Sequence, residues 1–295
     1  MTSLLPTRRD GGVPPLRSPA PRAGLLEVFQ RRYLLRLLVR REINARYSGS
    51  FLGLIWSYIN PLSQFCIYYF ILGKLLDRGT PNFAVHVFAG MIVVHFFNET
   101  FNAGTRSMVR NKNVIRKMAL PREMFPVASM LVSLYHVAPQ LLILLVVCLA
   151  YGWNPDPMGL LAIVMAITLA MLLGTGLALL FSVANVFFRD FASVVGILTN
   201  FVRFGVPMIY PYSIVEERFG ETLSQYYLYN PLASAVLLVQ RATWYGTLTV
   251  EERAGELPSY LFERGAIMIA IAAVFLVFAQ WVFRHFEDRI PERLT

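Results

Sequence analysis

The sequence predicts an all-α polytopic membrane protein, and three observations carry that prediction. Hydrophobic residues make up 56% of the 295 residues, charged residues only 15%, and several long stretches contain no Asp, Glu, Lys or Arg. A helix needs about 20 apolar residues to cross a hydrocarbon core about 30 Å thick, and residues 124–155 alone form a run of 32 without such a charge. The runs are continuous rather than alternating, which favours helices over barrel strands.

Six apolar segments are expected to span the membrane. They cover about residues 52–73, 83–101, 127–150, 159–183, 192–210 and 265–283. Pro61 in the first segment is compatible with a membrane helix, because neighbouring helices can satisfy the carbonyl group that it frees. The fifth segment carries Arg203, which either faces a water-filled path or pairs locally. Gly205, Pro207 and Pro211 follow and predict a broken or re-entrant end.

Both ends of the chain are expected outside the hydrocarbon core. Residues 1–24 combine prolines with arginines and predict a disordered basic tail. Residues 25–45 place Arg32, Arg36 and Arg40 at intervals of four, with leucines mostly on the other side. They are too charged to span and predict an amphipathic interface helix, either a membrane anchor or a docking element for a soluble partner. Residues 46–285 would form the transmembrane domain, and 286–295 a cytoplasmic tail.

A basic segment between the second and third predicted spans organises the chain. Residues 106–126 hold six basic residues and one acid, which is typical of a cytoplasmic loop. Val114, Ile115 and Met118 recur at helical spacing among these charges and predict a short amphipathic helix over about 108–122. The residues expected on its contact surface are Arg110, Asn111, Lys112, Val114, Ile115, Arg116, Lys117 and Met118.

The segment over about residues 205–262 is the longest part of the chain that is not expected to span. It is rich in Glu, and its apolar stretch between Pro231 and Trp244 is too short to cross a bilayer. Short re-entrant or surface helices near the outer face are therefore expected.

The distribution of basic residues predicts the orientation. Of the 27 Lys and Arg residues, 20 fall in segments that lie inside if both termini are cytoplasmic, and seven fall outside or within a span. Lys and Arg accumulate on the cytoplasmic side, so both termini are expected there. Topology and contact with anionic lipids then explain the net charge of +9, and no nucleic-acid partner is expected.

The motifs of common catalytic sites are absent from the sequence. There is no GxxxxGK[ST] phosphate loop, no HExxH, no GxSxG and no Cys/His cluster. Cys66 and Cys148 fall in apolar spans and are expected as buried thiols. No cofactor or metal is therefore expected in this chain. A membrane glycosyltransferase remains an alternative, although Asp190 is the only acid found at a membrane face that would suit one.

An ionisable pair lies within the second predicted span. His95 and Glu99 are four residues apart and so share one helix face. Ionisable residues inside a span are candidates for function. The pair is either a proton relay, as in a proton-coupled flippase of lipid-linked glycans, or a packing pair near the inner end.

Three segments in this order resemble the permease subunit of ABC-2 type exporters of polysaccharides, such as the O-antigen, teichoic acid and galactan exporters. The likeness runs from about residue 27 to 285. The segments are RYSGSFLGLIWSYINP at 46–61, NKNVIRKMALPRE at 111–123, and VPMIYP at 206–211 followed by YNPL at 229–232 and Arg241.

The resemblance implies a permease subunit that is not itself an enzyme, in a bacterial inner or plasma membrane. Two copies of the chain would pair with two separate ATPase chains, and ATP and Mg would bind to those partners. The basic segment would form a coupling helix seated in the ATPase. The implied substrate is an undecaprenyl-diphosphate-linked polysaccharide, either a cell-wall galactan or an O-antigen-like glycan.

Two sets of residues are expected to meet that substrate. Sugars stack on aromatic faces, and arginines bind phosphate groups in a bidentate manner. The candidates for diphosphate contact are Arg40, Arg41 and Arg46. The candidates for the substrate path are Tyr58, Tyr68, Tyr69, Phe96, Phe97, Phe101, Phe201, Phe204 and Tyr210.

Overall fold

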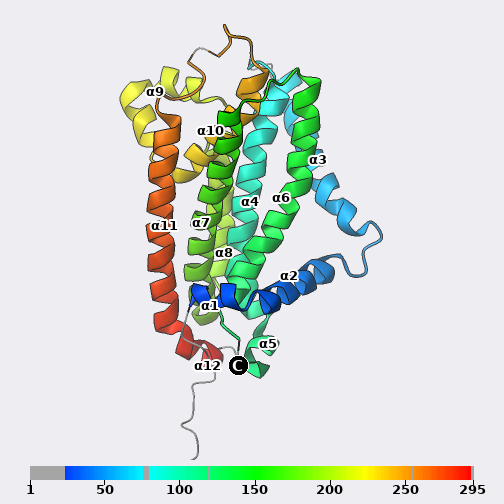
Figure 1. The fold of residues 1–295 in the computed structure, drawn as a ribbon, viewed down its shortest axis with the longest axis vertical. Helices are drawn as coiled ribbons and strands as arrows, with labels where there is room; N and C mark the ends of the chain where they lie inside the picture. The colour runs from blue at the N-terminus through cyan, green and yellow to red at the C-terminus, as the bar shows by residue number, and fades with distance from the viewer. Residues whose placement is uncertain (1–23, 76–79, 119, 254, 294–295) are drawn as a thin grey trace, which may run out of the picture.

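The computed structural model describes residues 24–75, 80–118, 120–253 and 255–293, and these ranges form helices and turns without a strand. The predicted tail over residues 1–24 lies outside the described residues apart from Gly24. Four long helices run along the molecule's longest axis (Figure 1). They are α4 (Phe83–Arg110), α6 (Met124–Ala150), α7 (Pro157–Phe187) and α11 (Leu261–Phe286).

These four helices are long and apolar enough to cross a membrane. They correspond to the second, third, fourth and sixth predicted spans, so the prediction of a polytopic helical membrane protein is confirmed. Helix α4 is central, since 83% of its most apolar window is buried, against 22% for α11. Helix α11 instead exposes Ile271, Val274 and Val277, as expected for a surface that faces lipid.

The predicted first and fifth spans correspond to shorter segments. The first consists of η1 (Gly53–Ile55), α3 (Trp56–Tyr68) with Pro61 inside it, and the π-helical η2 (Tyr69–Leu75). The fifth is α8 (Phe191–Phe204), 14 residues long. The chain leaves helical geometry at Gly205, as the proline and glycine pattern predicted, and α9 (Tyr212–Tyr227) starts after Pro211.

Helix α4 extends well beyond its predicted end at Phe101, because several of the polar residues that follow are wholly or partly buried in the bundle. The Asn102 amide donates to Thr199 Oγ1 at 3.1 Å, and the Asn185 amide donates to the Thr105 carbonyl at 3.2 Å. Gly104 allows close packing on α7, since a Cβ there would lie 2.4 Å from the Ala178 Cβ. A buried polar side chain is tolerated when it is hydrogen-bonded, so this stretch continues the helix.

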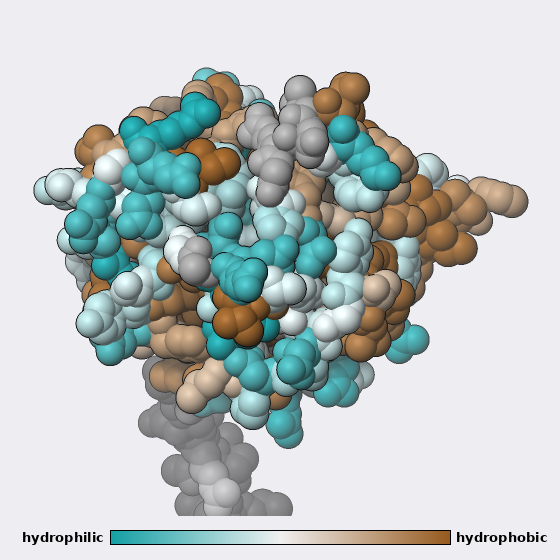
Figure 2. Space-filling view, turned by 90° about the horizontal axis from the view of Figure 1, so that it is seen from above, coloured by the Kyte–Doolittle hydropathy of each residue, from teal (hydrophilic) through white to brown (hydrophobic). Residues whose placement is uncertain are grey.

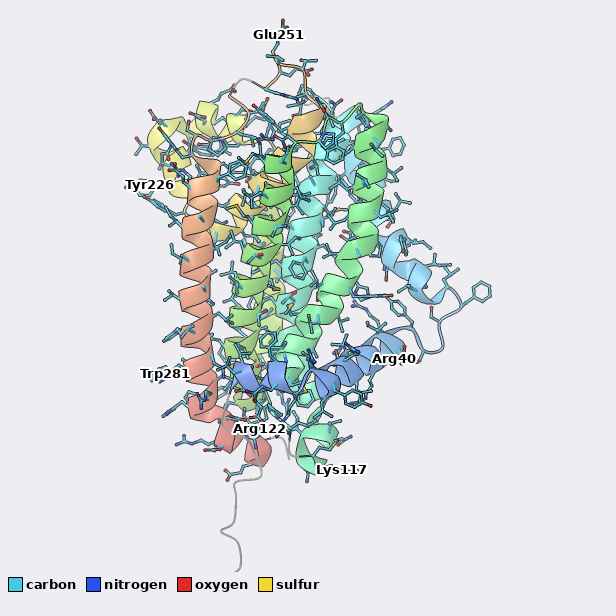
Figure 3. The ribbon with its side chains drawn as sticks, in the orientation of Figure 1. Arg40, Lys117, Arg122, Tyr226, Glu251 and Trp281 are labelled. Carbon is cyan, nitrogen blue, oxygen red and sulfur yellow. The ribbon has the colours of Figure 1, made fainter. Side chains whose placement is uncertain are left out.

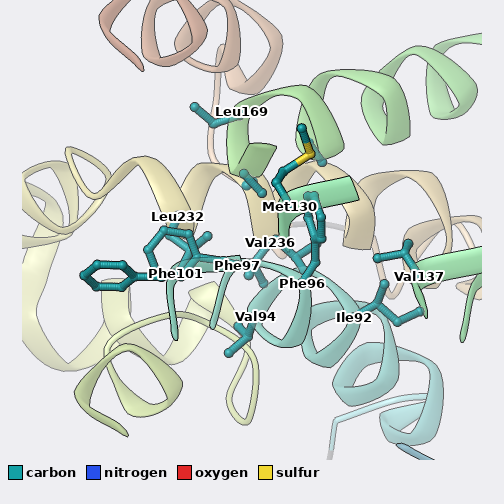
Figure 4. Close-up of a cluster of buried hydrophobic side chains, with 14 of the residues drawn as sticks. Ile92, Val94, Phe96, Phe97, Phe101, Met130, Val137, Leu169, Leu232 and Val236 are labelled. Carbon is teal, nitrogen blue, oxygen red and sulfur yellow. The ribbon is translucent and has the colours of Figure 1, made fainter. Parts of the chain in front are cut away.

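The hydrophobic core lies where α4, α6, α7 and the short α10 (Pro231–Ala242) meet (Figure 4). Helix α10 is almost wholly buried and begins with Pro231 after Asn230, whose side chain caps the Leu232 N–H at 3.0 Å. This agrees with the prediction of a short helix rather than a span between Pro231 and Trp244. The labelled core residues are Ile92, Val94, Phe96, Phe97, Phe101, Met130, Val137, Leu169, Leu232 and Val236.

The two ends of the bundle differ. One end carries α1 (Leu25–Gln30), α2 (Arg32–Tyr47), α5 (Lys112–Lys117), η4 (Glu287–Arg289) and α12 (Ile290–Arg293), with α1 and α2 running across the bundle (Figure 1). The predicted interface helix is thus broken in two at Arg31. The other end carries α9 and η3 (Trp244–Thr247), and Figure 2 shows hydrophilic residues over much of that end.

Candidate functional site

The predicted coupling helix is present as α5, but it is shorter than the expected range of about 108–122. Helix α4 ends at Arg110, and Asn111 leaves helical geometry with φ −99° and ψ 20°. The Asn111 amide donates to the Ser107 carbonyl at 3.0 Å, and this local bond competes with helix continuation. At the other end Met118 is extended, with φ −131° and ψ 133°. Pro121 follows three residues later.

The apolar side of α5 faces its own chain. Ile115 is 8% exposed, and Val114 is half-buried against the core. The expectation that Val114 and Ile115 point toward a partner is therefore corrected: they anchor α5 to the bundle. The exposed apolar residue is Met118, at 53%. The exposed polar side chains of α5 are Lys112, Asn113, Arg116 and Lys117.

A carboxylate that the sequence did not single out holds the junction between α4 and α5. Arg110 Nη2 lies 2.5 Å from Glu42 Oε2, and the Asn111 amide donates to Glu42 Oε1 at 3.0 Å. The neighbouring Arg41 Nη1 donates to Asn111 Oδ1 at 3.5 Å. Arg41 and Glu42, two successive residues of the amphipathic helix α2, thus contact the end of α4. Their partners are Arg110, the last residue of α4, and Asn111, where helical geometry ends. In the sequence, Glu42 is one acid among many basic residues, and nothing in the sequence pattern marks it as a contact residue.

The C-terminal end of α2 is tied to α4 and α6. Arg46 Nη2 forms an ion pair with Glu99 Oε1 at 2.7 Å. The Tyr47 hydroxyl forms a hydrogen bond of 2.8 Å with His136 Nε2 and another with Ser57 Oγ at the start of α3. Glu99 was predicted to pair with His95 or relay protons with it. In the structure the Glu99 carboxylate joins α2 to α4 through Arg46, and the pairing with His95 stays a prediction.

A cavity of about 320 Å³ lies between α2, α4 and α6. Of the three arginines predicted to meet a diphosphate, Arg41 and Arg46 line it, whereas Arg40 is exposed and does not. Arg32 and Arg36 are exposed as well. The full lining consists of Arg41, Glu42, Ala45, Arg46, Glu99, Ala103, Arg110, Asn111, Ser129 and Val132.

The predicted aromatic path is divided by the structure. Phe96, Phe97 and Phe101 are at most 3% exposed and belong to the core, so they are corrected to packing residues of this chain. Phe201 and Phe204 on α8 are strongly exposed, at 72% and 66%.

The tyrosines of the predicted path occupy intermediate positions. Tyr58 is exposed, while Tyr68 and Tyr69 are half-buried. Tyr68 shares a cavity of about 40 Å³ with Arg203. The Tyr210 hydroxyl donates to the Phe204 carbonyl at 2.9 Å and so fastens the break after α8.

A second polar site lies at the opposite end of the bundle, at the start of α7. Asp156 accepts a hydrogen bond from the Gly159 N–H at 2.6 Å and pairs with Arg241 Nη2 at 2.8 Å. The hydrogen bond from Arg241 holds the pKa of Asp156 below its ordinary value. Trp153 Nε1 donates to the Ala242 carbonyl at 3.1 Å. These contacts join the turn before α7 to α10.

The fold therefore defines a multi-pass membrane protein with a basic helical element exposed at one end. The sequence matches the ABC-2 type transporter family over residues 33–244, and the chain belongs to this family. It is a permease, a transport subunit rather than an enzyme.

Named relatives cover most of the chain. The sequence is 28% identical over 267 residues to the O-antigen export system permease protein RfbA of Myxococcus xanthus. The aligned residues cover 90% of this chain and 96% of that protein. The sequence is 27% identical over 218 residues to a Klebsiella pneumoniae protein of the same name, covering 74% and 83%. It is also 25% identical over 215 residues to the polysialic acid transport protein KpsM of Escherichia coli, covering 72% and 81%.

Proposed function

We propose that this chain is the transmembrane subunit of an ATP-driven exporter that moves a lipid-linked polysaccharide out of the bacterial cytoplasm. The observation that carries the proposal is the position of α5, a basic helix exposed at the end of the central apolar helix α4. A partner that pushes on α5 acts directly on the core of the bundle. The names of the relatives support a polysaccharide as the cargo.

The end that carries α5 faces the cytoplasm in this proposal. Arg40, Lys117 and Arg122 lie at that end of the molecule, and Glu251 lies at the other (Figure 3). Basic residues gather on the cytoplasmic side of membrane proteins. The described chain starts at α1 and finishes at α12, both at the same end (Figure 1), so this orientation places both termini in the cytoplasm.

The surface offered to the ATPase consists of the exposed polar side chains of α5 together with Met118. Because Val114 and Ile115 face inward, the contact depends on Met118 for its apolar part. The bases at its rim would pair with acids on the partner. Coupling requires that this contact differ between two states of the ATPase, and attachment alone is not enough.

A second copy of the chain would cover α8, giving two permeases and two ATPases. Helix α8 is too short and too exposed to be a self-sufficient span, and its exposed apolar residues recur at intervals of three or four. An apolar stripe at this spacing is typical of a helix that packs against a partner. The stripe consists of Val194, Ile197, Leu198, Phe201 and Phe204.

The cavity beside α2 is the proposed site for the diphosphate of a lipid-linked glycan. Its volume of about 320 Å³ lies at the lower end of the range for small-ligand pockets. Arg41 and Arg46 line it, and arginine suits phosphate because its planar fork binds two oxygens at once. The glycan would then pass along the exposed aromatic residues of α3, among them Tyr58. We propose a galactan or an O-antigen-like glycan.

The energy source tests this function. Surface glycan is measured in cells that carry either the native partner ATPase or one whose phosphate-loop lysine is replaced, each with and without a protonophore. We expect export to stop when the ATPase is inactivated and to outlast a brief loss of the proton gradient. Export that survives without the ATPase and collapses with the gradient would refute the proposal and favour the proton-coupled flippase.

A further inference from the structure

Helix α2 is attached to α4 at two levels. Near the end of the bundle Glu42 holds Arg110 and Asn111, and farther in Arg46 holds Glu99. Eleven residues separate Glu99 from Arg110 on α4, which is about 16 Å of helix at 1.5 Å per residue. Helix α2 packs on α6 and runs across the bundle (Figure 1). These two side-chain links connect it as a brace to α4, at the α5 junction and farther into the bundle.

Within the outer of these two attachments, the Glu42 carboxylate and Asn111 have little contact with water. The Glu42 side chain is 9% exposed and Asn111 is 5% exposed, while Arg110 remains half-exposed. A shielded carboxylate needs its partners, because removing one leaves an uncompensated charge. Both Glu42 oxygens are used, one by Arg110 and the other by Asn111. The junction thus cannot tilt freely without either moving α2 or breaking these bonds.

The other end of α2 leads toward α3. Tyr47 is the last residue of α2, and its hydroxyl contacts Ser57 in the first turn of α3 as well as His136 on α6. A shift of α2 therefore reaches α3 through a short chain of direct contacts. Helix α5 follows directly on the end of α4 and packs on the core through Ile115, and α2 adds a route from this junction to α3.

We propose that Glu42 is a positioning residue that makes α2 move together with α5, so that a push on α5 reaches α3 as well as α4. The inference rests on the proposed ATP-driven export, because it concerns how that work is transmitted. Without Glu42 the ATPase still binds and hydrolyses ATP, but α2 and α3 no longer follow α5. Hydrolysis then proceeds with little export.

The first experiment compares glycan exported with ATP hydrolysed in purified complexes. We expect the ratio to fall by about fivefold or more in Glu42→Ala, within the usual range of coupling factors. Glu42→Gln, which keeps an oxygen for Asn111 but loses the charge, should give an intermediate ratio. Glu251→Gln at the opposite end is the matched control and should leave the ratio unchanged. The ATPase should co-purify in wild-type amounts in all three variants.

A packing role predicts a different result from a positioning role. If Glu42 served only to hold the fold together, Glu42→Ala would lower the yield of the complex and leave the ratio of export to hydrolysis unchanged. That result would overturn the proposal. Arg110→Ala added to Glu42→Ala should lower the ratio no further, because partners in one interaction are not additive. A further, independent drop would also refute the pairing.

The second experiment measures the link directly and does not need export. Spin labels are placed at Arg40→Cys on α2 and Lys117→Cys on α5, both exposed, after Cys66 and Cys148 are replaced by Ala. Labelled chains are diluted with unlabelled ones, so that the distances measured lie within one chain. We expect one narrow distance distribution in the parent protein and a broader one in Glu42→Ala. An unchanged distribution would overturn the proposal.

The two experiments also separate this inference from the proposed function. If no ATPase co-purifies with the parent chain, the proposed function fails, yet the spin-label result still decides whether Glu42 fixes α2 to α5. If the ATPase does co-purify and Glu42→Ala exports normally for each ATP hydrolysed, the proposed function stands and the inference about Glu42 fails.

Discussion

Ile115 and Met118 provide the sharpest test of how α5 works, because the structure gives them opposite roles. Ile115 is 8% exposed and fastens α5 to the bundle, whereas Met118 is 53% exposed and lies just beyond the helix. Truncating a buried Ile to Ala costs about 2–5 kcal/mol. A six-residue helix at the edge of the bundle can relax, so we expect a cost at the lower end, about 2 kcal/mol. Met118→Ala should stay within about 0.5 kcal/mol of the parent.

The assay pairs thermal unfolding of the detergent-solubilised chain with capture of the partner ATPase. A loss of about 2 kcal/mol lowers the apparent Tm by about 4–8 °C in a chain of this size class. We expect that fall in Ile115→Ala, with ATPase capture retained on the folded fraction. Met118→Asp should keep the parent's Tm and lose capture, while Met158→Asp, equally exposed at the other end, should keep both. Normal capture by Met118→Asp would refute the assigned contact surface, and an unshifted Tm in Ile115→Ala would refute the anchoring role.

Three further predictions test other parts of the structure. Gly104→Ala should destabilise the chain by about 1–3 kcal/mol through overpacking, and Ala178→Gly should restore much of the Tm, because the two Cβ atoms would collide. Asp156→Ala should lower stability by about 0.5–2 kcal/mol through loss of the helix cap. Asp156→Asn, which can still cap, should lose under about 1 kcal/mol because the ion pair is partly exposed. Phe201→Asp with Phe204→Asp should yield monomers in light scattering, and an unchanged mass would refute the α8 interface.

The sign of the pH dependence at Asp156 follows from its lowered pKa. A carboxylate whose pKa is lower in the folded state than in the unfolded state stabilises the fold above the unfolded value of 3.8. That contribution is lost as the pH falls through the folded pKa, so it is constant near neutrality and disappears only in acid. The difference in Tm between the parent chain and Asp156→Asn should therefore shrink below about pH 4. A difference that grows in acid would contradict the assignment.

The sequence was sufficient for the long apolar helices, because their signal is local. Helices α6, α7 and α11 begin and end within a few residues of their predicted limits. The end of α4 was missed because Asn102, Thr105 and their neighbours are polar, and only their partners on α7 and α8 show that they are buried. The burial of Phe96 in the core was not predicted, for a related reason. Hydropathy places an aromatic residue in a span without saying which helix it faces.

Glu42 shows why the site was harder to predict than the fold. Its partner Arg110 lies 68 residues away, so no pattern within either segment joins the two. From the sequence, Arg110 is one of the basic residues that predict the orientation of the chain. That role is compatible with its ion pair to Glu42. What distinguishes it from Lys112 is an acid on another helix, which becomes visible only once α2 is placed across the bundle.

The basic residues around α5 therefore have different roles: some make contacts within the chain, and others are exposed to solvent. Every basic residue at the cytoplasmic end contributes equally to the orientation of the chain in the membrane. This is because the positive-inside rule counts Lys and Arg without regard to their contacts. The structure divides them: Arg110 is bound to Glu42 and Arg122 to the Glu287 carbonyl, whereas Lys112, Arg116 and Lys117 extend into solvent. These three exposed bases of α5 can meet a partner without disrupting the contacts described above. A loss of export after replacing Arg110 thus reports on the brace between α2 and α4, and replacing Lys117 reports on the partner.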